Sequence, residues 1–227
     1  MKLPLYRKSK RTLYVIGAGG HGISLASVAV QSGFRRIQFI ETESEITKAN
    51  PNGTALLKDL LPELDNCSFA IAIGDNFYRE KVTNDLMSLA SEFNVQLNLP
   101  NIIHPQASIG RLVEMGIGNQ IFPTSNVGTC SVIQDFVILN HLSSVDHQSS
   151  CASYSSLAPG AVTGGNVQIG RRSAILIASS VAHQVHIGSD SVLAGNSFLK
   201  EDIADLVLYG GSPAKIIKNR NLGERYM

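Results

Sequence analysis

Short, continuous apolar runs recur along the first hundred residues and are separated by longer stretches with helical spacing. The runs are rich in β-branched and aromatic side chains, which predicts strands. These predicted strands lie at 12–16, 36–41, 69–74 and 96–99. Strands that alternate with helices indicate a small α/β domain with a Rossmann-like parallel sheet, which we place at residues 1–104.

Two stretches between these runs carry apolar residues three and four positions apart. The first ends near Ser32, and its predicted apolar stripe contains Ile23, Ala26 and Val30. The second covers 77–93 and repeats the same spacing at Val82, Leu86, Leu89 and Phe93. Each stretch is therefore predicted to form a helix that packs on the sheet.

After Pro105 the helical spacing vanishes and a period of six residues replaces it. Fourteen of sixteen positions in one column are aliphatic or Met: Ile109, Met115, Ile121, Val127, Ile133, Leu139, Val145, Cys151, Leu157, Thr163, Ile169, Ile175, Val181, Ile187, Leu193 and Leu199. Only Cys151 and Thr163 depart from that pattern. The residue two places before each is Ser, Ala or Val in fifteen of sixteen cases, and Asn119 is the exception.

Two coupled columns of this kind predict a parallel β-helix built from hexapeptide repeats, which we place at residues 105–227. Three six-residue units close one triangular coil of about eighteen residues, and coils stack about 4.8 Å apart. The aliphatic column points into the interior, and residues 107–199 provide about five coils.

Composition agrees with a narrow interior, because only 6% of the residues are aromatic and Trp is absent. With 19 basic and 18 acidic residues, the chain lacks the basic excess of a nucleic-acid-binding protein. The three cysteines form no CxxC pair, which favours packing thiols in a reducing compartment. We find no signal peptide and no membrane span, and so expect a cytoplasmic protein without membrane or nucleic-acid partners.

The phase of the repeat indicates which side chains face outward. His141, His147 and His183 each lie two places after the aliphatic column, at a corner of the coil. Gly165 follows His147 by eighteen residues and therefore stacks directly on it. A glycine there leaves room beside the imidazole and exposes a backbone N–H, an arrangement that suits a thioester carbonyl held next to a base.

The N-terminal domain carries a glycine-rich turn after its first predicted strand. Gly17, Gly19 and Gly22 match the dinucleotide fingerprint, and Glu41 ends the next strand. About ninety residues form only half of a dinucleotide-binding fold, so a mononucleotide-sized ligand fits better. Its phosphates would lie at the N-terminus of the first helix.

Six motifs in order resemble one family. They are Gly-Ala-Gly-Gly-His-Gly, Ala-Ile-Gly-Asp-Asn-x-x-Arg, Ile-His-Pro-x-Ala, Leu-Asn-(x)5-Asp-His, Gly-Gly-Asn-Val-x-Ile-Gly and Gly-Ser-Pro-Ala-Lys. The chain resembles the hexapeptide-repeat sugar acyltransferases of the PglD/NeuD type, from about Thr12 to Ile217. The resemblance implies a left-handed parallel β-helix, acetyl-CoA as co-substrate, a nucleotide-sugar or sialic acid acceptor, and a homotrimer with active sites between neighbouring subunits.

The resemblance also implies site residues. The catalytic group is His147 as general base, with Asp146 and Asn140. The substrate-binding residues are Gly19, Gly20, His21, Glu41, Thr42, Gly74, Asp75 and Asn76. The cofactor-binding residues are Ser156, Gly165, Ile177 and His186, and no metal is expected.

Three positions depart from the family pattern. Gln148 follows the histidine where relatives can carry an acidic residue. Ser156 stands where relatives can carry a second histidine. Glu41 and Thr42 replace a pair of aspartates. Arg79, which ends one motif, is either functional or a solvated helix charge.

The leading hypothesis is an acetyl-CoA-dependent N-acetyltransferase acting on a nucleotide-linked amino sugar, such as a UDP-4-amino-4,6-dideoxy sugar. A sialic acid O-acetyltransferase shares the fold, base and donor. A zinc lyase of the carbonic-anhydrase type needs three converging histidines, which the spacing does not provide. A non-catalytic nucleotide-sugar scaffold would bind substrate without releasing CoA.

Overall fold

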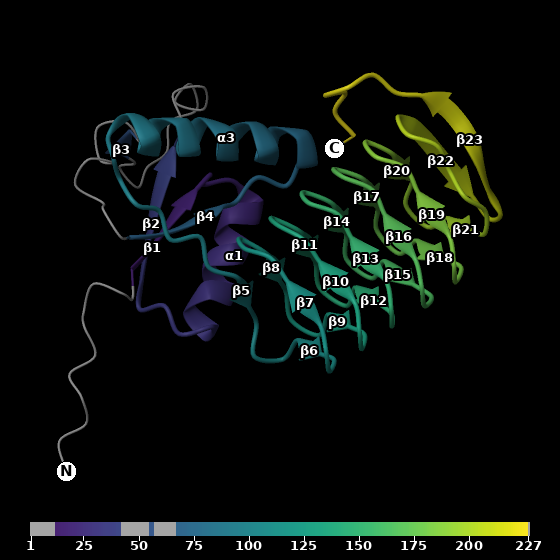
Figure 1. Ribbon diagram of the computed structural model, residues 1–227, viewed down its shortest axis with the longest axis horizontal. Helices are drawn as coiled ribbons and strands as arrows, with labels where there is room; N and C mark the ends of the chain where they lie inside the picture. Colours follow the sequence, from purple (N-terminus) through teal and green to yellow (C-terminus); the bar gives the residue numbers. More distant parts are fainter. Residues whose placement is uncertain (1–11, 42–54, 57–66, 227) are drawn as a thin grey trace, which may run out of the picture.

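The computed structural model describes residues 12–41, 55–56 and 67–226. In the N-terminal domain, the strands pair in the order β3-β2-β1-β4, and all pairs are parallel. The strands are β1 (Thr12–Ile16), β2 (Arg36–Glu41), β3 (Ala55–Leu56) and β4 (Ser68–Ile71). Figure 1 shows this sheet at one end of the molecule, with the helices beside it. The predicted small parallel α/β domain is confirmed.

Helices α1 (Gly20–Gln31) and α3 (Asn76–Glu92) pack on opposite faces of the sheet. Alternation along β1 explains this, since Leu13 and Val15 join one cluster and Ile16 joins the other. The predicted stripe of α1 is wrong, because Ile23 and Val30 are 63% and 55% exposed.

The stripe of α1 that packs on the sheet is instead Leu25, Val28 and Ala29. This helix carries apolar residues around most of its circumference, so its spacing does not identify the buried side.

The predicted strand at 96–99 is also wrong. In this stretch Asn98 makes only an isolated parallel bridge to Ser68. The chain then enters β5 (Ile102–Ile103), which already pairs with a strand of the β-helix.

A stack of two-residue strands follows, and each strand ends on the predicted aliphatic column. The strands are β6 (Ser108–Ile109), β7 (Glu114–Met115), β8 (Gln120–Ile121), β9 (Asn126–Val127), β10 (Val132–Ile133), β11 (Ile138–Leu139), β12 (Ser144–Val145), β13 (Ser150–Cys151), β14 (Ser156–Leu157), β15 (Val162–Thr163), β16 (Gln168–Ile169), β17 (Ala174–Ile175), β18 (Ser180–Val181), β19 (His186–Ile187), β20 (Val192–Leu193) and β21 (Phe198–Leu199). From β6 to β18, each strand pairs in parallel with the strand eighteen residues later, which confirms the predicted parallel β-helix.

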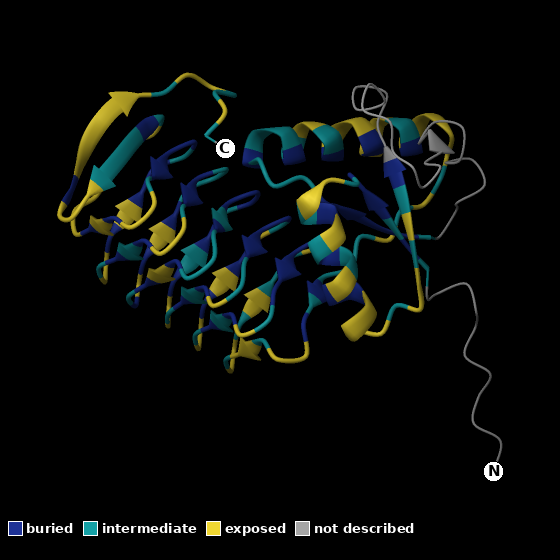
Figure 2. Ribbon diagram, turned by 180° about the vertical axis from the view of Figure 1, so that it is seen from behind, coloured by how far each residue is buried: buried dark blue, intermediate teal, exposed yellow. Residues whose placement is uncertain are grey.

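The coils make three sheets of five, six and eight strands. The eight-stranded sheet starts at β5 and ends in an antiparallel hairpin of β22 (Val207–Gly211) and β23 (Ala214–Asn219). Figure 2 shows that the coil strands of this sheet are mostly buried, while its terminal hairpin and the other faces carry many exposed residues. The N-terminal domain covers this sheet, since Ile102, Phe122 and Ile138 share a core cluster with α1.

The column residues are buried from Ile121 to Leu199, whereas Ile109 at the open end of the stack is 40% exposed. The preceding small residues are buried with them, as at Ser125 and Ser179. Corners are formed by one residue with positive φ, usually not glycine, such as Gln148 at 57°. This conformation is unfavourable for a residue with a Cβ, so coil stacking must stabilise each corner.

Arg79 of α3 lies at the junction of the two domains and is fully buried. Its guanidinium donates to backbone carbonyls of Phe136 and Tyr154 on the β-helix and of Ile73 in its own domain. Burial lowers the pKa of this side chain to about 10. The interpretation of Arg79 as a solvated charge is therefore wrong, and its contacts hold the domains together.

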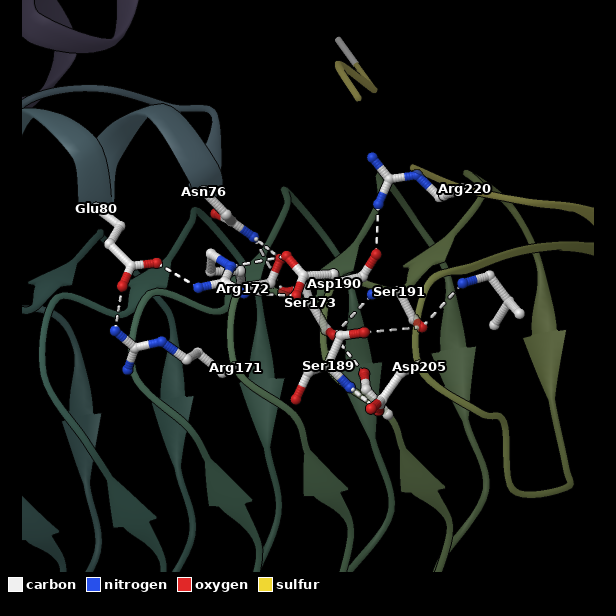
Figure 3. Close-up of polar contacts among 12 residues, drawn as sticks. Asn76, Glu80, Arg171, Arg172, Ser173, Ser189, Asp190, Ser191, Asp205 and Arg220 are labelled. Carbon is white, nitrogen blue, oxygen red and sulfur yellow. Dashed lines mark hydrogen bonds and ion pairs between the residues drawn. The ribbon is translucent and has the colours of Figure 1, made fainter. Parts of the chain in front are cut away.

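A polar network continues from this junction along the coils, as Figure 3 shows. Glu80 of α3 pairs with Arg171 and Arg172, and Arg172 pairs with Asp190 at 2.6 Å. The guanidinium of Arg220, after β23, donates to the backbone carbonyl of Asp190. The network therefore connects α3, two stacked corners and the C-terminal segment.

Residues 220–226 return from the hairpin to the start of α3, where the chain ends in Figure 1. The hydroxyl of Tyr226 accepts a hydrogen bond from the backbone N–H of Asn76 at 3.1 Å. The Arg225 guanidinium lies 4.8 Å from the ring centre of Tyr78. This segment is therefore a C-terminal strap across both domains.

Candidate active site

The corner that carries His147 has the predicted geometry. A Cβ added to Gly165 would lie 2.4 Å from both Cε1 and Nε2 of the His147 ring. The imidazole therefore packs directly against the Gly165 backbone, where no side chain fits. His147 is exposed, as expected for a corner position.

Two neighbours orient the imidazole and its backbone. The side-chain oxygen of Gln148 lies 3.2 Å from Nδ1 of His147. With the amide in this orientation, its oxygen accepts from a protonated Nδ1, and Nε2, which lies against Gly165, is left to carry the lone pair. Asp146 does not contact the ring, because its Oδ1 accepts from the backbone N–H of His147 at 2.7 Å.

Thr163 is the polar exception in the aliphatic column, and it lies one coil beyond this corner. Its Oγ1 accepts a hydrogen bond from the backbone N–H of Asp146 at 3.1 Å. The pairing of β12 with β15 retains only Ser144 and Val162 in register here. The sequence marked Thr163 as a departure from the column but did not assign it a role. A single hydroxyl among apolar side chains was the signal that this position makes a hydrogen bond.

Asn140 lies at a different corner, separated from His147 by strand β12. Its side-chain oxygen accepts from the backbone N–H of His141 and lies 2.7 Å from Nδ1 of that ring. Ile177 lies at this corner two coils later and is 62% exposed. A single chain therefore does not bring Asn140 and His147 together.

The glycine-rich turn has the shape of an anion site. Gly17 has a φ of 103°, and a Cβ on Gly22 would lie 2.1 Å from the Gly17 carbonyl oxygen, so both glycines permit the tight turn. Gly19 and Gly20 have open space around them. Gly19 is the N-cap of α1 and offers no side-chain cap, so the first backbone N–H groups of the helix stay available for an anion.

His21 is the second residue of α1, and its ring faces the β-helix. Nε2 lies 2.7 Å from Oε1 of Gln120, and the ring packs on Phe122 at a centroid distance of 5.6 Å. Burial lowers the pKa of His21 to about 4, so its imidazole is neutral near pH 7.

The turn at the start of α3 is occupied by contacts within the chain. Asp75 caps the helix by accepting from the backbone N–H of Tyr78 at 3.1 Å. The fully buried Asn76 donates to the carbonyls of Arg172 and Ser173, and the Gly74 carbonyl accepts from Arg79. Of the three, only Asn76 joins the two domains, whereas Asp75 and Gly74 make these contacts within the N-terminal domain.

The remaining predicted residues lie apart from these corners. Ser156 opens β14 on the sheet that faces the N-terminal domain, next to the Tyr226 hydroxyl. His186 is exposed on the five-stranded sheet. The side chain of Glu41 and all of Thr42 lie outside the described residues.

The described part of the chain gives no support for a metal site or for a nucleophilic role of Cys151. No three His, Cys, Asp or Glu side chains there gather at metal-binding distance. Cys151 is buried, which raises the pKa of its thiol to about 12 and makes it a packing residue. Neither described helix has the length and apolar character needed to cross a bilayer.

A parallel β-helix with a corner imidazole held against a glycine, preceded by a domain with an open helix N-terminus, is the architecture of the β-helix acyltransferases, and comparison with known proteins identifies the family. The family model for the PglD N-terminal domain matches residues 12–86. The acetyltransferase domain of PglB from Neisseria gonorrhoeae, solved with acetyl coenzyme A, is 30% identical. The match covers 92% of this chain and 100% of that chain, with a TM-score of 0.81.

Perosamine N-acetyltransferase from Caulobacter crescentus, solved as a histidine-to-asparagine mutant with CoA and GDP-perosamine, is 25% identical. That match covers 92% of this chain and 97% of the other, with a TM-score of 0.82. WeeI from Acinetobacter baumannii shares the fold at 22% identity, with coverage of 91% and 99% and a TM-score of 0.70. The chain belongs to the hexapeptide-repeat sugar acetyltransferases of the left-handed β-helix family, and it is a CoA-dependent acyltransferase.

Proposed function

We propose that this protein transfers the acetyl group of acetyl-CoA to the amine of a nucleotide-linked amino sugar, such as a UDP- or GDP-linked 4-amino-4,6-dideoxy sugar, for surface glycan biosynthesis. The observation that carries the proposal is the His147 ring held against Gly165 at an exposed corner of the coil. Histidine is the usual general base near neutral pH. The similar enzyme from Caulobacter crescentus is described with CoA and GDP-perosamine.

In the proposed reaction, the sugar nitrogen attacks the thioester carbonyl carbon while Nε2 of His147 removes a proton from that nitrogen. The C–S bond then breaks, and the proton passes to the departing CoA thiolate. Gly165 contributes its backbone N–H to the carbonyl oxygen as negative charge develops there. Asp146, Gln148 and Thr163 position the histidine and its corner.

The nucleotide binds through the N-terminal domain in this proposal. The open helix N-terminus at Gly19, Gly20 and His21 receives the phosphates, and Glu41 and Thr42 are the proposed contacts with the nucleoside. Acetyl-CoA lies along the corners that carry Gly165 and Ile177, with Ser156 and His186 as further predicted contacts. The reaction is placed in the cytoplasm.

A second copy of the chain completes the site. Asn140 and His147 lie at different corners of one β-helix, so a neighbouring subunit in a homotrimer supplies Asn140 next to His147. No relative named above is described as acting on sialic acid, so nothing favours the O-acetyltransferase alternative.

The test measures CoA thiol release with acetyl-CoA and a panel of amino-sugar nucleotides and sialic acids. His147→Ala should lower turnover by about 10²–10⁴. Refolding a mixture of inactive His147→Ala and Asn140→Ala chains should restore activity, because some sites then combine intact residues from two subunits. Undiminished turnover in His147→Ala, or release with sialic acids alone, would refute the proposal, and absent restoration would refute the shared site.

A further inference from the structure

Gln120 lies at the meeting point of the two domains, although no motif includes it. It is the first residue of β8 and is 1% exposed. Its Nε2 donates to the backbone carbonyl of Ile71 in β4 at 2.7 Å, and its Oε1 lies 2.7 Å from Nε2 of His21. The amide cannot turn over, because its oxygen would then face the Ile71 oxygen.

This fixed amide determines the tautomer of His21. The Gln120 oxygen only accepts, so Nε2 of His21 carries the proton and Nδ1 carries the lone pair. The imidazole is neutral near pH 7, since burial lowers its pKa to about 4. Within the described ranges, no residue donates a hydrogen bond to Nδ1.

His21 is connected to the corner of Asn140 by rings that pack on one another at tilted angles. Its ring packs on Phe122, and Phe122 packs on His141 with centroids 4.9 Å apart. The His141 ring in turn lies against the Asn140 side chain. A neutral imidazole offers a phosphate no positive charge. The backbone N–H groups at the start of α1 are better phosphate ligands, which leaves the His21 ring for another part of the substrate.

We propose that Gln120 is a positioning residue that holds the proton of His21 on Nε2, so that Nδ1 accepts a hydrogen bond from a hydroxyl or amine of the acceptor sugar. This inference rests on the proposed function. It deepens that function by assigning a specificity contact to a hydrogen-bond donor on the sugar rather than to the phosphates.

The first test observes the imidazole directly by ¹⁵N NMR of the histidine-labelled full chain. In the wild type, the His21 signals should show protonated Nε2 and unprotonated Nδ1. Adding GDP-perosamine, or a UDP-linked 4-amino-4,6-dideoxy sugar, should shift the Nδ1 resonance in the direction of hydrogen-bond acceptance. A proton on Nδ1, or no shift of Nδ1 with either probe, would overturn the inference.

The second test is Gln120→Glu, which keeps the shape and the acceptor beside Nε2 but adds a charge there and replaces the donor to the Ile71 carbonyl by a second carboxylate oxygen. The carboxylate favours the doubly protonated ring, so Nδ1 becomes a donor and opposes the sugar. We expect the KM for the same sugar probes to rise about 10- to 100-fold. The KM for acetyl-CoA should stay unchanged, and kcat should change by less than about twofold.

Gln106→Glu is the matched control, because Gln106 is exposed in a turn and should leave both KM values unchanged. Gln120→Leu separates fold from chemistry: it removes both hydrogen bonds without adding charge, so it should raise the sugar KM less than Gln120→Glu. Equal effects of the two Gln120 variants, tracking their loss of thermal stability, would make Gln120 merely structural and overturn the inference.

Failure of the proposed function has a different signature. A wild-type chain in which a sugar probe shifts the Nδ1 signal but releases no CoA would support the His21 contact and refute acetyl transfer. Turnover of the probes with an unshifted Nδ1 signal would support acetyl transfer and refute the His21 contact.

Discussion

Replacing Gly165 by Ala should separate catalysis from stability at the His147 corner. The new Cβ would lie 2.4 Å from Cε1 and Nε2 of His147, whereas ordinary carbon contacts are about 3.5–4.0 Å. The ring must therefore move by about 1 Å. Because His147 is exposed, its side chain can rotate away, and the free energy of unfolding should change by less than about 0.5 kcal/mol.

A displacement of about 1 Å in a catalytic group can lower turnover about 10²-fold. Turnover is measured by thiol release with the best acceptor of the panel, and stability by urea unfolding. Gly164→Ala is the contrasting variant, because its Cβ would meet the His183 backbone nitrogen at 2.8 Å and cannot be relieved by a side-chain rotation. That variant should lose about 1–3 kcal/mol of stability.

The double variant Gly165→Ala, His147→Ala tests whether the alanine at position 165 acts through the His147 imidazole. If the alanine acts by displacing the imidazole, adding it to His147→Ala should cost no further activity. Losses that multiply in the double variant would show that Gly165 acts independently of His147, and unchanged turnover in Gly165→Ala would show that the ring position does not matter.

Two further predictions concern the joined domains. His21 is protonated in the unfolded chain below about pH 6.5 but in the folded chain only below about pH 4, so stability should be complete above pH 6.5 and fall by up to about 3 kcal/mol between pH 6.5 and 4. Urea unfolding of the wild type and His21→Gln should therefore show different pH slopes in that window, and equal slopes would contradict the buried neutral imidazole. Arg79→Met should destabilise by about 3 kcal/mol or more, because buried carbonyls lose their donors, while the exposed Arg35→Met control should unfold like the wild type.

The hexapeptide period made the β-helix and the His147 corner predictable. A six-residue step determines both the register and the face of every residue, so Gly165 had to stack on His147 and Val145 had to point inward. The glycine-rich turn was predictable because its geometry restricts which residues fit. A side chain at position 22 would collide with the Gly17 carbonyl, so the spacing of the glycines reports the shape of the turn.

Contacts between the domains were beyond sequence reasoning. The roles of Arg79 and Gln120 depend on carbonyls of residues 49 to 75 positions away, which no local period reveals. The buried side of α1 was misassigned because its apolar residues surround the helix. Asn76, predicted from a motif as a substrate contact, is buried against Arg172 and Ser173, contacts that the motif does not indicate.

The C-terminal strap has a consequence for synthesis of the protein. Residues 220–226 contact Asn76 and Tyr78 at the start of α3, so this segment closes contacts with residues made about 150 positions earlier. The N-terminal domain and the coils can fold as they emerge, because their pairings are local or between adjacent coils. The contacts of the strap with α3 can form only after translation has passed Tyr226, later than those of Arg79 with Phe136 and Tyr154.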